Sequence, residues 1–178
     1  MNKAKFNVAD KATFTVSGIE FIKFPEVNGK VPVVARDILF NSRFGDNNDF
    51  SNSDIREKLN ELLEKIIAEV GAENICSFET DLTTLDGLKP YPALEAEIGI
   101  PTFDFVRQNV DVFDMYPVDD YWWTATPDSA QPHANPYLVV CVSPLGRIVF
   151  RNCNCNYCGV RPFLIFESTL FVSDGTEE

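Results

Sequence analysis

The longest regular pattern of apolar positions lies in the middle of the chain and predicts an amphipathic helix over residues 54–70. Its apolar residues step by 4, 3, 1, 3, 1 and 3, which places them on one face of an α-helix. They are Ile55, Leu59, Leu62, Leu63, Ile66, Ile67 and Val70. Ser53 or Asp54 is the expected N-cap, and Asp54 and Glu57 have the spacing of a capping box. Gly71 follows the last apolar residue and predicts the end of the helix.

Short runs of β-forming residues precede this helix and predict two hairpins. The expected strands are residues 12–16, 19–24 and 31–35. Ser17-Gly18 joins the first two, and Asn28-Gly29 is a two-residue turn signal before the third. Pro32 cannot donate a backbone hydrogen bond, so we expect it at the start of its strand or on a sheet edge.

The last third of the chain shows the same kind of pattern. Residues 137–142 and 147–150 flank a turn at 143–146, which predicts a further hairpin. Residues 163–166 predict a closing strand. Each of these runs is rich in β-branched or aromatic residues, which favour strands.

The stretch over residues 77–120 is less regular. Its prolines exclude long regular elements, and they are Pro90, Pro92, Pro101 and Pro117. We expect an insertion-like region that wraps the core. Within it, Leu82–Leu88 is either a strand or the approach to a short helix.

Together these elements predict an α+β fold with an N-terminal β-hairpin, one main amphipathic helix and a C-terminal antiparallel sheet. A chain of 178 residues is long enough for one domain with a sizeable core and too short for two. We therefore expect a single domain over residues 1–178, with a polar tail at 174–178. No run approaches the ~18 apolar residues of a membrane span, so membrane insertion is not expected.

The charge of the chain narrows the classes of partner. The net charge is −12, and the 15 Lys and Arg residues are spread along the chain, so direct nucleic-acid binding is not expected. A net negative charge commonly keeps a protein soluble. It also leaves open a protein that imitates nucleic acid and inhibits a host nuclease or defence complex. The basic N-terminus, Met1–Lys5, lacks the apolar segment of a signal peptide, so we expect synthesis in the cytoplasm and export only by another route, such as inside a virion.

Two motifs near the C-terminus resemble a known fold. The pair Trp122-Trp123, followed by Gly159-Val160-Arg161-Pro162, is similar to the C-terminal half of the C-type-lectin-like fold. Within that fold the chain most resembles an uncharacterised family of bacterial and phage domains. This family is related to formylglycine-generating (sulfatase-modifying) proteins and to the variable proteins of diversity-generating retroelements. The resemblance covers residues 13–167 and is weakest over 86–120.

The matched residues are expected to have structural roles. Trp122 and Trp123 are large enough to anchor the core of a small sheet. Gly159 permits a close backbone approach or a positive φ. Arg161 is expected to hold loop carbonyls or a buried carboxylate through its planar guanidinium. Pro162 is expected to begin the final strand.

The cysteines are the most reactive-looking residues of the chain. They are Cys76, Cys141, Cys153, Cys155 and Cys158. Their odd number, without a secretion signal, argues against a disulfide framework. The last three, with His133 or Cys141, could supply four zinc ligands, but Cys-x-Cys on a strand separates its two thiols by ~7 Å. We therefore expect neither a metal nor a cofactor.

A catalytic alternative follows from the resemblance. Formylglycine-generating enzymes carry a redox or copper-binding cysteine pair just before their Gly-Phe-Arg ending, which implies Cys153 or Cys155 with Cys158 as its analogue. Their Arg-Gly-Gly-Ser-Trp segment is replaced here by Asp120-Tyr121-Trp122-Trp123. His133, the only histidine, is expected to be exposed and idle, without a recognisable Ser or Cys partner. The chain is therefore expected not to be an enzyme, with an oxidase of this kind as an alternative.

Residues 152–158 are the expected ligand-binding segment. If they form a strand, Asn152, Asn154 and Asn156 share one face. The other face then carries Cys153, Cys155 and Tyr157. Asn is a poor strand former, so three in alternation suggest a polar face kept exposed for contact. The full set of expected ligand-binding residues is Asn152, Asn154, Asn156, Tyr157, His133 and Asn135.

The resemblance also bears on how this segment is used. In the variable proteins of diversity-generating retroelements, hypervariable residues lie at this position and arise from Asn codons, which implies a diversified site. A static binding face and a solvated edge without a role are the alternatives. We expect a non-catalytic binding or structural module, such as a virion-surface or receptor-binding protein of a phage or prophage. Its expected partner is a host cell-surface ligand or another virion protein, and a homo-oligomer is compatible with either.

Overall fold

The structure, a computed structural model, describes residues 6–172. Its main elements in chain order are β1 (Thr13–Val16), β2 (Ile19–Lys23), β3 (Lys30–Ala35), β4 (Phe40–Asn41), α1 (Ile55–Val70), β5 (Phe78–Thr80), β6 (Leu94–Ala96), α2 (Phe103–Gln108), α3 (Val110–Met115), β7 (Trp122–Pro127), β8 (Leu138–Val142), β9 (Ile148–Asn152), β10 (Gly159–Val160) and β11 (Phe163–Glu167). Short 3-10 turns lie at Phe50–Asn52, Ala72–Asn74 and Ser168–Leu170. The N-terminal Met1–Lys5 and the polar tail expected at 174–178 lie outside the described residues.

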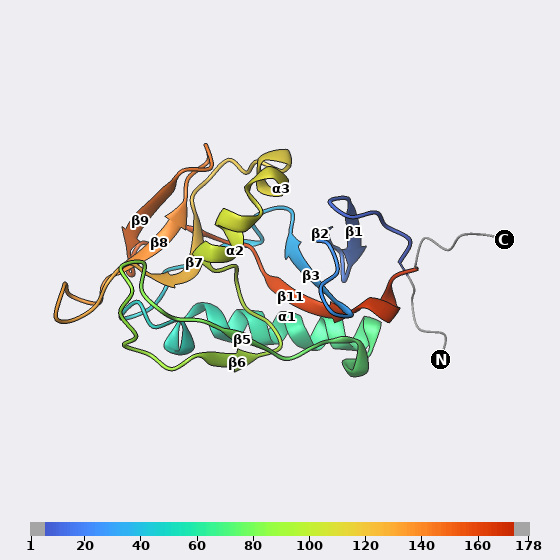
Figure 1. Cartoon of the computed structure of the whole chain (residues 1–178), viewed down its shortest axis with the longest axis horizontal. Helices are drawn as coiled ribbons and strands as arrows, with labels where there is room; N and C mark the ends of the chain where they lie inside the picture. Colours follow the sequence, from blue (N-terminus) through green and yellow to red (C-terminus); the bar gives the residue numbers. More distant parts are fainter. Residues whose placement is uncertain (1–5, 173–178) are drawn as a thin grey trace.

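The strands form two main sheets and one small one (Figure 1). The first has the order β1-β2-β3-β11 and is antiparallel throughout. The second, β4-β10-β7-β8-β9, is antiparallel except for the pair β10–β7, and β5 pairs with β6 alone. The protein is thus α+β, with the predicted N-terminal hairpin. The predicted C-terminal antiparallel sheet is wrong in part, because β10 pairs in parallel with β7 and β4 joins the sheet from the N-terminal part of the chain. The last strand of the protein, β11, pairs with β3 from the N-terminal part of the chain and not with β7, β8, β9 or β10, which come directly before it in sequence.

The two predicted N-terminal turns have the backbone that their sequences require. In Ser17-Gly18 the φ angles are 52° and 75°, and in Asn28-Gly29 they are 52° and 78°. Positive φ at both central residues is the type I′ turn, whose twist matches that of the flanking strands. Pro32 is the third residue of β3, a central strand between β2 and β11, and it pairs with Ile165 of β11, so its expected place at the strand start or on a sheet edge is wrong. Its carbonyl accepts the Phe24 N–H at 3.0 Å.

The predicted amphipathic helix is α1, and its apolar stripe is buried. The buried residues are Ile55, Leu59, Leu62, Ile66 and Val70. Gly71 ends the helix with a φ of 87°, and its N–H donates to the Ile67 carbonyl. The stripe and its glycine stop therefore lie where the sequence pattern predicts them.

The predicted capping box of α1 is wrong. Asp54 makes no side-chain cap and pairs instead with Arg43. The Ser53 hydroxyl accepts the Ile55 N–H at 3.2 Å, so Ser53 is the residue that caps the helix. A guanidinium donates strong charge-assisted hydrogen bonds, and tertiary folding brings Arg43 within reach of the Asp54 carboxylate.

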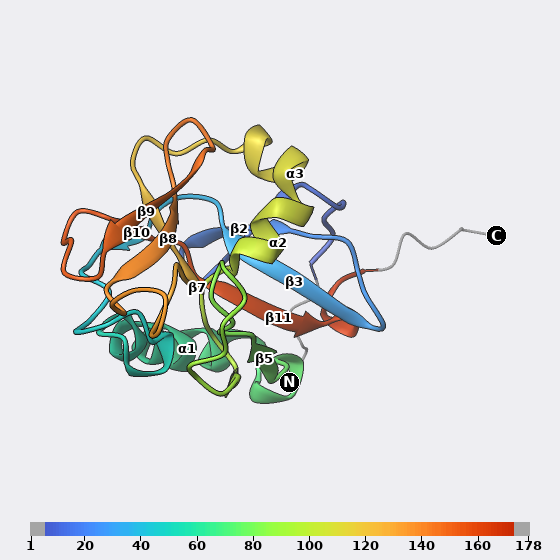
Figure 2. The same cartoon turned by 60° about the vertical axis from the view of Figure 1, so that its left-hand side comes forward.

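The four-stranded sheet is buried on both faces. Successive strand residues point to opposite sides. Phe21 and Val33 therefore pack in a core with α1, whereas Ile22 and Val34 pack in a second core with α2 and α3. Figures 1 and 2 show α1 along one side of β3 and β11, with the α2–α3 pair along the other.

Trp122 and Trp123, at the start of β7, belong to these two cores separately. Trp123 is 0% exposed, and its Nε1 donates to the Ser42 carbonyl at 2.8 Å. Trp122 faces the other core, with its ring 5.5 Å from that of Phe113. Two adjacent tryptophans on one strand thus anchor two cores, because neighbouring side chains point in opposite directions.

The Gly-Val-Arg-Pro motif lies where the two sheets meet. A Cβ on Gly159 would lie 2.5 Å from Cγ2 of Ile38, so a close approach requires this glycine. Arg161 is buried and donates to two consecutive carbonyls at residues 35–36, at 3.1 and 2.8 Å. It therefore holds backbone carbonyls, the first of its two predicted roles. Pro162 immediately precedes β11, as predicted.

Residues 77–120 contain only short elements. The expectation of a strand or a helix approach over Leu82–Leu88 is wrong, because these residues form a turn. The Thr84 hydroxyl accepts the Leu88 N–H at 2.8 Å and stabilises that turn locally. α2 and α3 have six residues each, too few for apolar periodicity to reveal them in the sequence. Among residues 6–172, no helix has the length and apolar character needed to cross a membrane.

Candidate functional site

The expected ligand-binding segment is a turn and not a strand. β9 ends at Asn152, and the Asn152 side-chain oxygen accepts the N–H of Asn154 at 3.1 Å. The Cys155 N–H donates to the Asn152 carbonyl at 2.9 Å. Asn side chains compete in this way for backbone donors and favour turns over strands. The strand interpretation of residues 152–158 is therefore wrong.

The polar character expected of this segment is nevertheless present at its surface. Asn152, Asn154, Asn156 and Tyr157 are exposed, and Tyr157 has 51% of its surface in solvent. Cys153 is buried, with its N–H donated to the Tyr137 carbonyl at 2.7 Å. The turn thus keeps its asparagines outside while a buried cysteine attaches it to the start of β8.

Part of this surface is concave. A pocket of 340 Å³ is lined by Arg43, Gly45, Asp46, Tyr137, Asn152, Cys153 and Asn154. We call Tyr137, Asn152, Asn154, Arg43 and Asp46 the loop face. Tyr137 is 48% exposed, which leaves much of its ring available for contact. The loop face combines an aromatic ring, two amides and an ion pair, the side-chain types that bind hydroxyl-rich ligands.

The Arg43 guanidinium is fixed within the loop face by two carboxylates. It pairs with Asp46 and with Asp54. The hydrogen bonds to Asp46 and then to Asp54 raise the pKa of Arg43 above its usual value. Arg43 therefore stays charged at any physiological pH. The loop face presents it as part of an oriented ion pair and not as a free cation.

A buried asparagine holds the two sides of the loop face together. Asn48 is 0% exposed, and its Nδ2 donates to the carbonyls of Ser129 and Leu138 at 2.8 and 3.1 Å. Its Oδ1 accepts the Tyr91 hydroxyl at 2.6 Å, and its N–H donates to the Pro136 carbonyl at 2.9 Å. These bonds join segments far apart in sequence, so the surface is preorganised by buried polar contacts.

His133 and Asn135 lie on the loop before β8 and do not line the loop-face pocket. His133 is exposed, as expected, but it is not idle. Its Nδ1 lies 2.8 Å from Oδ2 of Asp86, which also accepts the Ser129 hydroxyl at 2.6 Å. The Asn135 side-chain oxygen accepts from Gln131 at 3.1 Å. His133 therefore joins its loop to the turn that contains Asp86, whereas Asn135 stabilises the loop itself.

The Asp86 cluster is not a catalytic triad. The hydrogen bonds from Ser129 and Thr84, and then from His133, hold the pKa of Asp86 well below its usual range. Its hydroxyl partners therefore donate to an ionised carboxylate. In a triad the histidine stands between the acid and the hydroxyl. Here the carboxylate stands in the middle, so Ser129 has no base that could activate it.

The cysteines near the turn are thiols in this structure. The Sγ atoms of Cys155 and Cys158 lie 3.7 Å apart. A hydrogen bond with Cys141, together with burial, raises the pKa of Cys158, and burial raises that of Cys153. A raised pKa keeps a thiol protonated and unreactive. Among residues 6–172, no three or more His, Cys, Asp and Glu side chains are grouped so that they could hold a metal ion.

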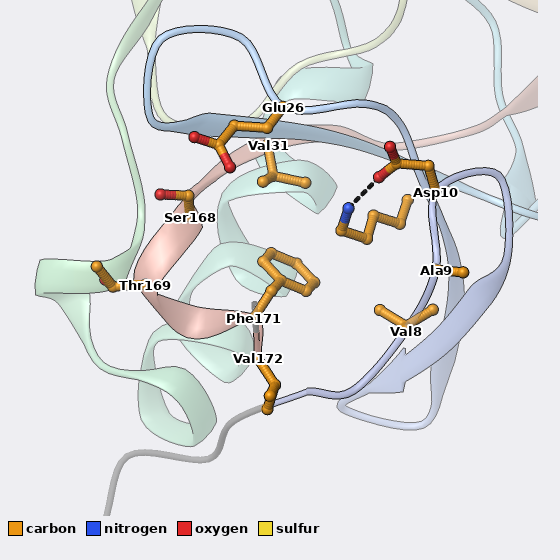
Figure 3. Close-up of a pocket in the computed structure, with 10 residues that line it drawn as sticks. Val8, Ala9, Asp10, Glu26, Val31, Ser168, Thr169, Phe171 and Val172 are labelled. Carbon is orange, nitrogen blue, oxygen red and sulfur yellow. Dashed lines mark hydrogen bonds and ion pairs between the residues drawn. The ribbon is translucent and has the colours of Figure 1, made fainter. Parts of the chain in front are cut away.

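A pocket of 650 Å³ is lined by residues near both ends of the described chain and by residues of β2 and β3 (Figure 3). Lys23 lines this pocket, pairs with Asp10, and has its Nζ 5.5 Å from the centre of the Phe171 ring. The ammonium group of Lys23 thus already has an anionic partner. The lining ends at Val172, the last described residue, and we assign no ligand to this pocket.

Sequence reasoning found Asn152, Asn154 and their exposure but missed three members of the loop face. The sequence pattern places Tyr137 in a predicted strand, and Arg43 and Asp46 lie in a polar, turn-rich segment more than 90 residues before it. Only the fold brings these segments together. A comparison of the chain with protein-family models, with curated proteins and with solved structures finds no significant match.

Proposed function

We propose that this protein is a non-catalytic binding module of C-type-lectin-like fold that recognises a neutral, hydroxyl-rich ligand at the loop face. The observation that supports this most is the pocket in which the exposed Tyr137 ring meets the Asn152 and Asn154 side chains. Aromatic rings pack on the apolar face of a sugar, and amides both donate to and accept from its hydroxyls. The ligand class proposed is therefore a glycan.

The order of elements supports the fold assignment. An N-terminal hairpin, one main helix, a hairpin after the Trp-Trp pair and a closing strand follow one another as the resemblance implies. The tryptophans and Arg161 are buried. With the resemblance to phage domains, this favours a virion-surface or receptor-binding component whose partner is a host cell-surface glycan.

The test is binding to purified cell envelope and to an array of bacterial glycans. Tyr137→Ala and Asn154→Ala should each weaken binding about threefold to tenfold, the loss expected for one contact of about 0.5–1.5 kcal/mol. Asn60→Ala is the matched control, because Asn60 is an exposed asparagine of α1 that does not line the pocket. Equal binding by wild type, Tyr137→Ala and Asn154→Ala would contradict the proposal.

The net charge of −12 favours one second function, an acidic inhibitor of a host nuclease or defence complex. The two functions differ in their response to salt. An inhibitor bound to a basic channel loses affinity steeply as ionic strength rises, whereas neutral hydrogen bonds and ring contacts depend on salt only weakly. Pull-down from host lysate at low and high salt separates them, and recovery of a nucleic-acid-binding protein at low salt alone would favour the inhibitor. An oxidase is not the function that we propose, because Cys153 and Cys158 are buried and the pKa values of their thiols are raised.

A further inference from the structure

A second concave site lies at the opposite end of the β8–β9 hairpin from the loop face. It is a pocket of 200 Å³ between α3 and the turn that joins these strands. Its inner lining is apolar and buried, with Phe113, Trp122 and Val142 among its members. Val110 and Leu145 also line it and are 52% and 88% exposed, so they lie at its mouth.

Arg161 lines the same pocket and is the most buried of its residues, at 1% exposure. Its guanidinium carbon lies 4.8 Å from the Trp122 ring centre and 5.3 Å from that of Phe113. A guanidinium has five N–H groups. Nε and one N–H of Nη2 donate to the backbone carbonyls of residues 35–36. The remaining three N–H groups have no hydrogen-bond partner among residues 6–172.

The charge of Arg161 is not neutralised by contact. No ion pair joins it to a carboxylate among the described residues. Burial lowers the pKa of Arg161 to about 10, and the charge of Asp37 opposes this from a distance. A buried charge without a contacting counter-ion is costly, so an anion that reached Arg161 would be stabilised there.

Two features of the pocket limit what the anion can be. Its volume is below the ~300–1000 Å³ of sites for drug-sized ligands, so the ligand is small. Asp114 also lines the pocket and is exposed, so a second negative charge on the ligand would meet a like charge. The apolar walls require an apolar body.

We propose that this pocket binds a small monocarboxylic acid with an apolar or aromatic body. The carboxylate accepts from the free N–H groups of Arg161, and the body packs against Phe113 and Val142. Arg161 thereby has two roles, since two of its N–H groups hold the backbone and the others hold the ligand. Planar carboxylates fit the fork of a guanidinium, which makes them better ligands here than a spherical anion.

Benzoate is the probe, with benzamide as its uncharged counterpart of the same shape. Titration of the full chain, followed by amide NMR shifts, should give saturable shifts near Val110, Val142 and Gly146 and none at Asn154. Benzamide should bind at least tenfold more weakly. Equal affinity for the two compounds, shifts confined to other regions, or no saturable shift up to about 10 mM would each overturn the proposal.

Arg161→Met removes the charge but also the bonds to two backbone carbonyls, so it can fail to fold. The decisive variant is Val110→Trp, which fills the mouth of the pocket and leaves Arg161 untouched. It should abolish the benzoate shifts. Val27→Trp is the matched control, because Val27 is a 61% exposed valine outside this pocket, and it should leave them unchanged. Benzoate binding that survives Val110→Trp would overturn the proposal. Glycan binding at the loop face should be the same in both variants.

Discussion

At the scale of single residues, the Gly-Val-Arg-Pro motif shows how a short segment makes contacts with residues far away in the sequence. Gly159 pairs with Trp122 of β7 and with Asn41 of β4, so it lies between two strands. The side chain of Ile38 fills the space where a Cβ would stand. The residue is therefore a glycine for steric reasons, which differ from the positive φ that Gly18 and Gly29 require.

We expect Gly159→Ala to lower the free energy of unfolding by about 1–3 kcal/mol, the usual cost of overpacking a core. Its added Cβ would stand 2.5 to 2.7 Å from three carbons of Ile38. Urea denaturation measures the effect. Gly45→Ala is the control, because the nearest atom to a Cβ there is 3.5 Å away. Combining Gly159→Ala with Ile38→Ala should cost less than the sum of the two single changes, and strict additivity would contradict the steric explanation.

At the scale of elements, α1 shows which helix signals are local. Its stripe and its glycine stop depend on residues within the helix and follow the sequence pattern. Its N-cap depends on competition for Asp54. Arg43, eleven residues earlier, takes that carboxylate, and Ser53 caps the helix in its place. Capping is thus decided by a tertiary contact even where the spacing for a capping box is present.

We expect Ser53→Ala to destabilise the protein more than Asp54→Ala. Loss of an N-cap costs about 1 kcal/mol, and Ser53 also donates to the Phe44 carbonyl within the core. Asp54 contributes only an exposed ion pair, which is worth about 0–1 kcal/mol. Chemical denaturation of the two variants compares them directly. The reverse order would show that Asp54 is the true cap.

At the scale of the whole molecule, Asn48 joins three regions that the sequence separates. Its side chain contacts Tyr91, Ser129 and Leu138, and its backbone contacts Pro136. Asn48 is buried two residues after Asp46, and its bonds to Pro136 and Leu138 lie on either side of Tyr137, so it ties these two parts of the loop face together. The geometry of the loop face therefore depends on a residue that does not line its pocket.

We expect Asn48→Ala to lower the free energy of unfolding by about 2–3 kcal/mol, because it leaves buried carbonyls without donors. It should also weaken glycan binding at temperatures where the protein is still folded. Asn47→Ala serves as the neighbouring control, since that side chain accepts a single N–H and its loss should cost about 1 kcal/mol. Unchanged stability of Asn48→Ala would show that the contacts are not needed to hold the loops.

Stability should also fall at alkaline pH. Burial, and then a hydrogen bond to Glu167, raises the pKa of the Cys76 thiol from 9.0 to about 11. Between these values the unfolded chain loses the proton and the folded chain keeps it, so stability declines as pH rises from 9 to 11. Cys153, Cys158 and Tyr91 shift in the same direction. Thermal unfolding under reducing conditions measures the decline, and Cys76→Ala should make it shallower. An equally steep decline of stability with pH in Cys76→Ala would show that the Cys76 thiol does not contribute to it.

The sequence by itself determined the features that depend on neighbours along the chain. The stripe of α1, the Ser17-Gly18 and Asn28-Gly29 turns and the β8–β9 hairpin arise from side-chain periodicity and from backbone preference. The size and apolarity of Trp122-Trp123 made their burial predictable. These properties act over a few residues, so they can be read without knowing the fold.

Tertiary structure alone decided the rest. It paired β11 with β3, turned residues 152–158 away from the β9 strand, and placed Arg43 and Asp46 beside Tyr137. It also brought Arg161 into an apolar pocket with three N–H groups that no residue of the described chain accepts. Each outcome depends on contacts between residues far apart in the chain. The apolar pattern of a single segment does not determine such contacts, because many different arrangements of the segments would bury the same apolar faces.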